Sequence, residues 1–142
     1  MLIPKLSALF ETSLASSLSA VGSTFSVVSG TDRDGNAISG LYGFILDEGS
    51  ANEEFVIGTI SGTTITISYR GIDADAPNTE VSANKKAHRR GASVKITDYP
   101  VLGILRNILN GDEGLPNPLK YATGVVPVTS DDLVDKAYAD AL

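Results

Sequence analysis

Residues 82–96, "SANKKAHRRGASVKI", contain the only histidine of the chain, His88, and five of its eleven Lys and Arg residues. They contain no carboxylate, although the whole chain of 142 residues has a formal charge of −6. Three kinds of chemistry need such residues: contact with nucleic acid, catalysis by the histidine, and docking on an acidic protein. The rest of the sequence helps to choose among them.

Nucleic-acid binding and catalysis both need partners that this stretch does not supply. A nucleic-acid site needs aromatic side chains that stack on bases or a helix that enters a groove, and usually a basic excess over the whole domain. Catalysis by His88 needs a nucleophile beside it, and no Gly-x-Ser-x-Gly turn is present. The neighbouring cations Lys86, Arg89 and Arg90 are expected to disfavour the protonated imidazole. We therefore expect no enzyme, no catalytic residue and no nucleic-acid partner.

Two interpretations of the basic stretch remain open. Lys85, Lys86, Arg89 and Arg90 are candidates for docking on an acidic protein partner, which includes an acidic face of a neighbouring copy. Alternatively, the stretch is a solvated turn before the next strand, with His88 packed locally.

A metal or cofactor site is not expected elsewhere. Asp32, Asp34 and Asn36 alternate as calcium ligands do, but Gly35 comes one place too early for an EF-hand loop and no Glu closes it. A plain turn is favoured. The chain has no Cys, which excludes disulfides, zinc–thiolate sites and cysteine nucleophiles. No glycine-rich phosphate loop is present.

Adjacent carboxylates occur in the sequence, among them Asp47-Glu48, Glu53-Glu54 and Asp131-Asp132. Each pair falls in a predicted turn or at a helix start, where acidic residues are solvated or cap a helix. A glycosidase would instead need two carboxyl groups brought together from separate elements.

The alternation of apolar residues predicts a mainly β fold, a small compact β-barrel or sandwich-like domain. The clearest element is a hairpin over residues 53–70 with a two-residue Ser61-Gly62 turn. That turn pairs Ile60 with Thr63, Gly58 with Ile65 and Val56 with Ile67. The predicted core face carries Val56, Ile60, Ile65, Ile67 and Tyr69. The other face carries Thr64, Thr66, Ser68 and Arg70, with Phe55 and Ile57 as apolar exceptions.

A helix is predicted after the last strand. Thr97 or Asp98 can cap it, Pro100 suits its first turn, and Asn110-Gly111 is a stop signal. Its apolar residues cover nearly the whole circumference: Val101, Leu102, Ile104, Leu105, Ile108 and Leu109. Such a helix is buried on more than one side, either under the sheet or against another subunit.

Four segments follow from these patterns: an extended N-terminal arm (1–22), a β-domain (23–97), an apolar helix (98–111) and a C-terminal segment (112–142). The last is a Pro-rich extended connector that ends in a helix, where Val134, Tyr138 and Ala141 are spaced by four and three residues. We expect that helix to be the neck of a longer coiled coil. No apolar run approaches the ~18 residues of a membrane span, so no membrane is expected.

The order of these elements resembles a small β-domain of tailed-bacteriophage virion proteins. The hairpin "EEFVIGTISGTTITISYRGID" is followed by a loop, "AHRRGASVKI" and an apolar helix. The positions that match the family's pattern are Gly62, Thr63, Thr64, Arg70, Gly71, Ala87, His88, Gly91, Ala92 and Val94. The segment "LPNPLKYATGVVPVTSDDLVDKAYADAL" is similar to the region that precedes fibre shafts. The resemblance spans roughly residues 20–142.

The resemblance implies a structural component of the virion, of the tail-fibre, baseplate or collar type, which attaches a fibre or adaptor through protein–protein contacts. It implies other virion proteins as partners and a homo-oligomer, with a trimer favoured. Val101, Leu105, Ile108 and Leu109 are the expected assembly residues, and Val134, Tyr138 and Ala141 those of the neck. The alternative is a glycan-binding module of a receptor-binding protein, for which the dispersed tyrosines Tyr42, Tyr69, Tyr99, Tyr121 and Tyr138 are the available aromatics.

Overall fold

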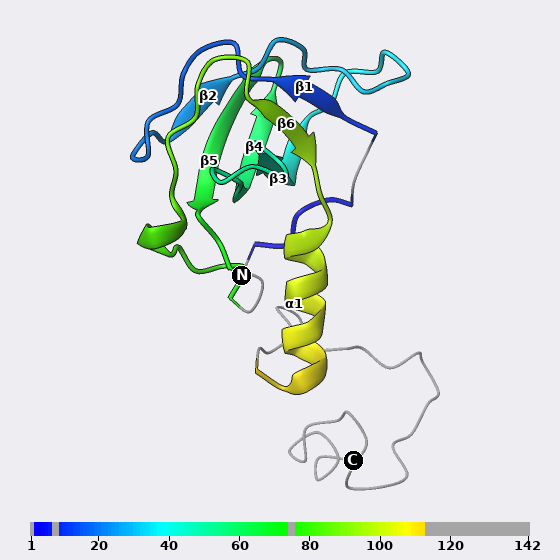
Figure 1. Ribbon diagram of the computed structural model, residues 1–142. Coiled ribbons are helices and arrows are strands. Elements are labelled where there is room, and N and C mark those ends of the chain that lie inside the picture. The colour runs from blue at the N-terminus through cyan, green and yellow to red at the C-terminus, as the bar shows by residue number, and fades with distance from the viewer. Residues whose placement is uncertain (1, 7–8, 74–75, 113–142) are drawn as a thin grey trace, which may run out of the picture.

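The structure, a computed structural model, describes residues 2–6, 9–73 and 76–112. It contains a six-stranded antiparallel half-barrel followed by one helix (Figure 1). The elements are β1 (Glu11–Ser13), β2 (Thr24–Ser26), β3 (Gly40–Leu46), β4 (Glu54–Ser61), β5 (Thr64–Arg70), the 3₁₀ turn η1 (Ser82–Asn84), β6 (Ser93–Ile96) and α1 (Tyr99–Asn110). The predicted mainly β class, with one helix after the last strand, is confirmed.

The sheet has the order β1-β6-β3-β4-β5-β2, so the two shortest strands form its edges. The sheet curls until these edges meet, because Leu14 and Val27 form a bridge just beyond β1 and β2. Curling gives the sheet an inner face that buries the main core. That core contains Phe10, Leu14, Leu18, Phe25, Val27, Ile38, Tyr42, Phe44, Leu46, Val56, Ile60, Ile65, Ala92, Val94 and Ile96.

The N-terminal arm predicted over residues 1–22 is not separate from the β-domain. Its residues 11–13 form β1, which pairs with β6, and Phe10, Leu14 and Leu18 are buried in the core. The boundary at residue 23 was therefore wrong for this part of the chain. The apolar residues of this Ser-rich segment are widely spaced. They become a buried face only once the segment pairs with the edge of the sheet.

The hairpin β4–β5 forms as predicted, but its register differs by two residues. Ser61 pairs with Thr64 and Ile60 with Ile65, so the turn is Gly62-Thr63 rather than Ser61-Gly62. Gly62 has a φ of 60°, at the first central position, where a type II′ turn requires glycine.

A β-bulge in this hairpin changes which side chains face the core. Ile57 pairs with Tyr69 and Gly58 with Ile67, so Ser68 is the extra residue of β5. Cross-strand partners share a face, so Tyr69 lies on the outer face with Ile57, and Arg70 lies on the inner face with Val56. The predicted faces of Tyr69 and Arg70 were therefore wrong, whereas Val56, Ile60 and Ile65 are in the core.

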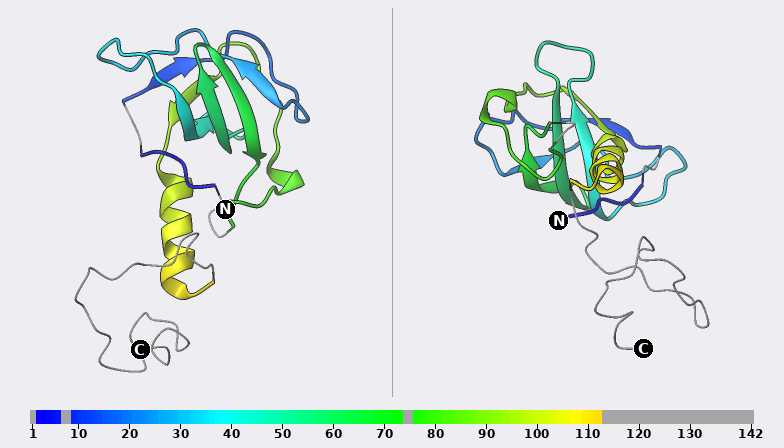
Figure 2. Two further views of the ribbon diagram at one scale, coloured as in Figure 1. Left: turned by 180° about the vertical axis from the view of Figure 1, so that it is seen from behind. Right: turned by 90° about the horizontal axis from the view of Figure 1, so that it is seen from below.

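Helix α1 extends from one end of the half-barrel, as Figure 2 shows from behind and from below. Its start is tied to β3 because the Thr97 N–H donates a hydrogen bond to the Gly43 carbonyl (2.9 Å). The buried residues of the helix are Pro100, Gly103, Ile104 and Asn107. Within the described part of the chain the helix is buried on one side only, so the prediction of burial on several sides is not met there.

The predicted connector and neck helix, with Val134, Tyr138 and Ala141, lie outside the described residues. Among the described residues, no helix is both long and apolar enough to cross a membrane.

Candidate functional site

His88, the residue that the sequence singles out as the main candidate for chemistry, is buried. Its backbone forms a bridge with Leu18, with both N–H···O distances at 2.8 Å, which fixes residues before β6 against residues beyond β1. The imidazole then lies between two carboxylates. Its Nδ1 is 2.8 Å from Asp47 Oδ2, and its Nε2 is 2.8 Å from Glu54 Oε2.

Glu54 also binds an arginine from the neighbouring strand. Arg70 Nε donates to Glu54 Oε1 (2.8 Å) and Arg70 Nη2 to Glu54 Oε2 (3.0 Å), which is the bidentate geometry of a strong ion pair. The Lys86 backbone N–H donates to Glu54 Oε2 at 2.9 Å. We call Asp47, Glu54, Arg70 and His88 the buried charged cluster.

The remaining donors of Arg70 connect the cluster to distant parts of the chain. Nη1 donates to the carbonyls of Ser19 (2.6 Å) and Gly22 (2.9 Å), and Nη2 donates to the carbonyl of Lys86 (2.5 Å). One guanidinium therefore joins the segment between β1 and β2 to the segment before β6. Buried arginine is tolerated because each charge is paired and hydrogen-bonded.

The charges of the cluster reinforce one another. Burial alone would lower the pKa of His88, but its hydrogen bonds to Glu54 and Asp47 and the attraction of both carboxylates outweigh burial and raise that pKa. Burial would raise the pKa of Glu54, but the hydrogen bonds from His88, Arg70 and the Lys86 N–H lower it overall. The cluster therefore favours a charged imidazolium beside a charged carboxylate.

Two sequence expectations about these residues were wrong. The cations beside His88 in sequence were expected to disfavour its protonated form, yet the groups that face its ring are carboxylates. Glu54 was expected to be solvated, yet its side chain has no exposed surface. One signal could have identified Glu54, since it shares the inward alternation of β4 with Val56 and Ile60.

The cluster acts as a structural tie. The side chains of Glu54 and His88 have no exposed surface, so neither can contact a substrate in this conformation. Glu54 already accepts four hydrogen bonds at its two oxygens. These hydrogen bonds hold β4, β5 and the segment before β6 together.

The four predicted docking cations separate into two pairs. Lys85 Nζ forms an ion pair with Glu80 at 2.6 Å, and Lys86 Nζ donates to the Ala83 carbonyl at 2.9 Å. Arg89 and Arg90 are exposed, and neither side chain forms an ion pair with another residue in the part of the chain that the structure describes. The turn that carries them follows directly on buried His88, so the cluster positions this arginine pair at the surface.

The aspartate-rich turn binds its own backbone. Asp32 Oδ1 accepts hydrogen bonds from the N–H groups of Asn36 (2.8 Å) and Asp34 (3.0 Å). The pKa of Asp32 is lowered, chiefly by the Asn36 N–H. Across residues 2–6, 9–73 and 76–112, no group of three or more His, Asp or Glu side chains could hold a metal ion.

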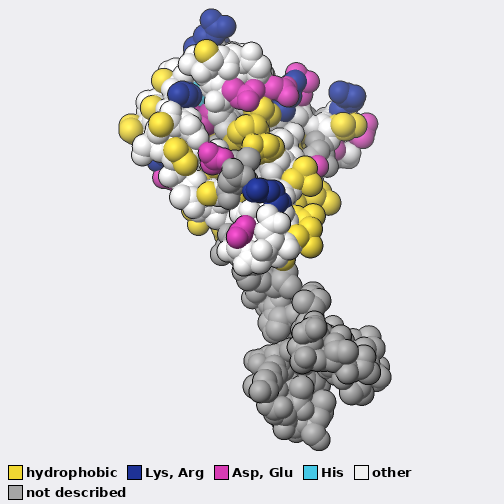
Figure 3. Space-filling model, turned by 60° about the horizontal axis from the view of Figure 1, so that its bottom comes forward, with side chains coloured by type: hydrophobic (Ala, Val, Ile, Leu, Met, Phe, Trp, Pro, Cys, Tyr) yellow, Lys and Arg dark blue, Asp and Glu magenta, His cyan; other side chains and the backbone are white. Residues whose placement is uncertain are grey.

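The predicted assembly residues lie on or beside the open side of α1. Leu105 is 50% exposed and Leu109 is 77% exposed, together with Leu102 at 61%. Val101 and Ile108 are half-buried. Figure 3 shows hydrophobic side chains gathered at the surface of the described part of the chain. We call Leu102, Leu105 and Leu109 the exposed leucine face.

Comparison with known proteins adds no relative. No family model matches the chain, and no curated protein sequence or solved structure matches it either. The resemblance to virion proteins stays a prediction from the sequence.

Proposed function

We propose that this chain is a structural component of a tailed-bacteriophage particle. It attaches a fibre or adaptor to the tail, baseplate or collar through protein–protein contacts. Its partners are other virion proteins and further copies of itself, with a trimer favoured, and its location is the virion.

The observation that carries the proposal is the exposed leucine face of α1. Three leucines, each at least half exposed, project from a helix whose other side is buried at Ile104 and whose first residue, Tyr99, stacks on Phe55 of β4. Leu102, Leu105 and Leu109 are spaced by three and four residues, the spacing at which apolar side chains form the seam between associating helices. Apolar surface concentrated in this way marks a site of protein interaction.

The residues behind the family resemblance support the proposal in a second way, because two parts of the motif meet in space. Arg70 and His88 both bind Glu54. Gly71 has a φ of 60°, and a Cβ atom there would lie 2.8 Å from the Lys85 N and the Val81 O. The Arg-Gly and Ala-His parts of the motif therefore have one physical role, which is to close the β-domain.

Purified particles test the proposal directly. Phage particles from a lysate of the source strain would be separated on a density gradient and analysed by quantitative mass spectrometry. We expect peptides of this chain at a fixed ratio to the major tail proteins, and cross-links from α1 to a neighbouring virion protein. If the chain were absent from intact particles and found only in the soluble fraction, the proposal would be wrong.

A further inference from the structure

Both ring nitrogens of His88 contact a carboxylate. Nδ1 lies 2.8 Å from Asp47 Oδ2, and Nε2 lies 2.8 Å from Glu54 Oε2. A neutral imidazole carries only one N–H, so both contacts are hydrogen bonds only when the ring is the doubly protonated imidazolium. Loss of either proton leaves a nitrogen lone pair facing a carboxylate, and that contact then breaks.

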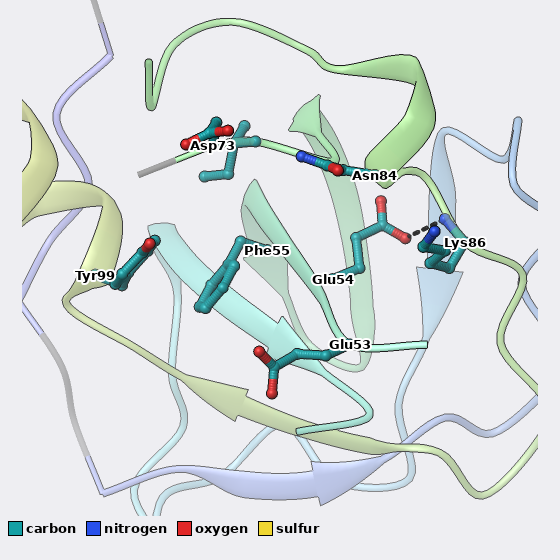
Figure 4. Close-up of a pocket in the computed structure, with 8 residues that line it drawn as sticks. Glu53, Glu54, Phe55, Asp73, Asn84, Lys86 and Tyr99 are labelled. Atoms are coloured by element: carbon teal, nitrogen blue, oxygen red, sulfur yellow. Dashed lines mark hydrogen bonds between the residues drawn. The ribbon is translucent and has the colours of Figure 1, made fainter. Parts of the chain in front are cut away.

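The contact with Glu54 is the one that is held in place. The Glu54 side chain has no exposed surface, and its oxygens also accept hydrogen bonds from Arg70 Nε and Nη2 and from the Lys86 backbone N–H. Figure 4, a view into the pocket beside the start of α1, shows the Glu54 carboxylate next to Lys86, with this hydrogen bond as a dashed line. Turning Glu54 away from the ring would also leave Arg70 buried without its ion pair. Nε2 therefore keeps its proton.

Asp47 differs from Glu54 in both respects. Its side chain is 18% exposed, and across residues 2–6, 9–73 and 76–112 its carboxylate is bound by His88 alone. The backbone of Asp47 is fixed separately, because its N–H donates to the Ser93 carbonyl and its carbonyl accepts from the Ser50 N–H, both at 3.0 Å. The carboxylate can therefore turn away from the ring without displacing β3.

A second pocket gives the carboxylate somewhere to turn. It has a volume of about 320 Å³ and is lined by Asp47, Ser50, Asn52, Ala87 and Arg89. Arg89 is the cation of this pocket, and its side chain forms no ion pair within the part of the chain that the structure describes. Arg90, the next residue, does not line the pocket.

We propose that Asp47 is a pH-dependent switch, which binds His88 while the imidazole is charged and Arg89 once it is neutral. As the pH rises, the Nδ1 proton passes to solvent hydroxide and the Nε2–H remains bound to Glu54. The Asp47 carboxylate turns into the pocket and forms an ion pair with the Arg89 guanidinium. An acidic partner would therefore meet two free arginines on this turn only while the imidazole is charged. The exchange itself is independent of the proposed function, because it needs neither α1 nor a partner protein.

The other charged groups near the imidazole already have partners. Arg70 of β5 is bound to Glu54, and Lys86 Nζ donates to a backbone carbonyl. Lys95 of β6 pairs with Glu48 at 2.6 Å. The segment between β1 and β2 carries no titratable side chain. Burial lowers the pKa of the imidazole but the two carboxylates raise it by more, so the exchange takes place above pH 6.5.

An NMR titration of the isotope-labelled full chain from about pH 5 to about pH 9 tests the exchange. We expect both ring nitrogens of His88 to carry a proton at acidic pH, and only Nδ1 to shift to the position of an unprotonated nitrogen as the pH rises. The side-chain Nε–H signal of Arg89 should shift with the same midpoint, while that of Arg90 stays constant. Loss of the proton from Nε2 instead, or an Arg89 signal that does not follow His88, would overturn the proposal.

Asp47→Asn and Glu48→Gln form the matched pair of variants. Each removes one negative charge at the end of β3 with little change of side-chain size, and asparagine tolerates the φ of 52° found at position 47. The Arg89 signal should no longer titrate in Asp47→Asn and should keep its full shift in Glu48→Gln. An Arg89 shift that survives Asp47→Asn would contradict the exchange. The wild-type titration decides the proposal by itself where Asp47→Asn loses stability.

Discussion

The buried charged cluster and the exposed leucine face of α1 invert the usual distribution of side chains. In the half-barrel, Glu54, Arg70 and His88 are charged groups withdrawn from water. On α1, Leu102, Leu105 and Leu109 are apolar groups left in water. The two regions are joined by β6, which follows the turn after His88 and leads into the helix.

The two regions differ in whether the described residues of the chain supply their partners. Every charge of the cluster has a partner, so the half-barrel is complete in itself. The leucines have no partner among the described residues that removes them from water. We therefore expect substitutions in the cluster to change folding stability, and substitutions on the leucine face to change association.

The largest loss of stability is expected from Glu54→Gln. It leaves Arg70 and His88 as buried cations without their shared carboxylate, which should lower the free energy of unfolding by about 3–5 kcal/mol. Urea denaturation followed by circular dichroism measures this. Glu53→Gln is the matched control, because Glu53 is exposed and its neighbour is not; its effect should stay within about 0.5 kcal/mol. Similar losses in both variants would contradict the structural role of the cluster.

Adjacent residues of α1 give the next comparison. Ile104 is buried and Leu105 is half exposed. Ile104→Ala should lower the free energy of unfolding by about 2–5 kcal/mol, the cost of a core cavity, and Leu105→Ala by less than about 1 kcal/mol when measured at a concentration where the chain is monomeric. An equal cost at the two positions would mean that α1 is not oriented as described.

His88→Gln tests the charge state inside the half-barrel. At pH 6 it should cost about 1–3 kcal/mol, because Glu54 and Asp47 lose a buried donor. The pKa of His88 is raised above its ordinary 6.5, so its contribution to stability is complete below pH 6.5 and is lost as the pH rises through the raised value. The unfolding free energy of the wild type should therefore fall above pH 6.5, and this fall should vanish in His88→Gln.

At acidic pH, the free energy of unfolding should depend on Glu54. Its pKa is lowered below 4.5, so its contribution is complete above pH 4.5 and is lost as the pH falls through the lowered value. The loss of stability at acidic pH should persist in His88→Gln, although the pH at which it occurs should change. A wild-type profile that is flat from pH 4 to 8 would contradict a charged cluster.

The smallest effect on stability is expected from the double variant Arg89→Glu/Arg90→Glu. Both side chains are exposed, so the free energy of unfolding should change by less than about 0.5 kcal/mol. If this turn docks on an acidic virion partner, as proposed, docking should weaken in the variant and should no longer fall with added salt, since the charge of the turn is reversed. Unchanged particle assembly with unchanged salt sensitivity would exclude docking through this turn.

The sequence predicted the elements whose signals are local. The hairpin β4–β5 and the helix α1 follow from alternation, turn residues and caps within a few positions. What it missed depends on contacts between distant segments. The bulge at Ser68 exchanges the faces of Tyr69 and Arg70, and no residue type in this segment predicts the bulge.

The candidate site was predictable only in part. Arg70 and His88 were recognised as members of one motif, and Glu54 occupies an inward position of β4 that alternation could have identified. Their contact could not be predicted, because Glu54 lies 16 residues from Arg70 and 34 from His88. The environment of the imidazole is set by those distant carboxylates rather than by its neighbours in the chain.

Sedimentation equilibrium of the full chain, compared with the double variant Leu105→Glu/Leu109→Glu, tests the central claim most directly. We predict that the wild type sediments as a homo-oligomer, with the mass of a trimer, and that the variant sediments as a monomer with an unchanged circular dichroism spectrum. A wild type that remains a monomer at the highest concentration, or a variant that keeps the mass of the wild type, would contradict assembly through α1.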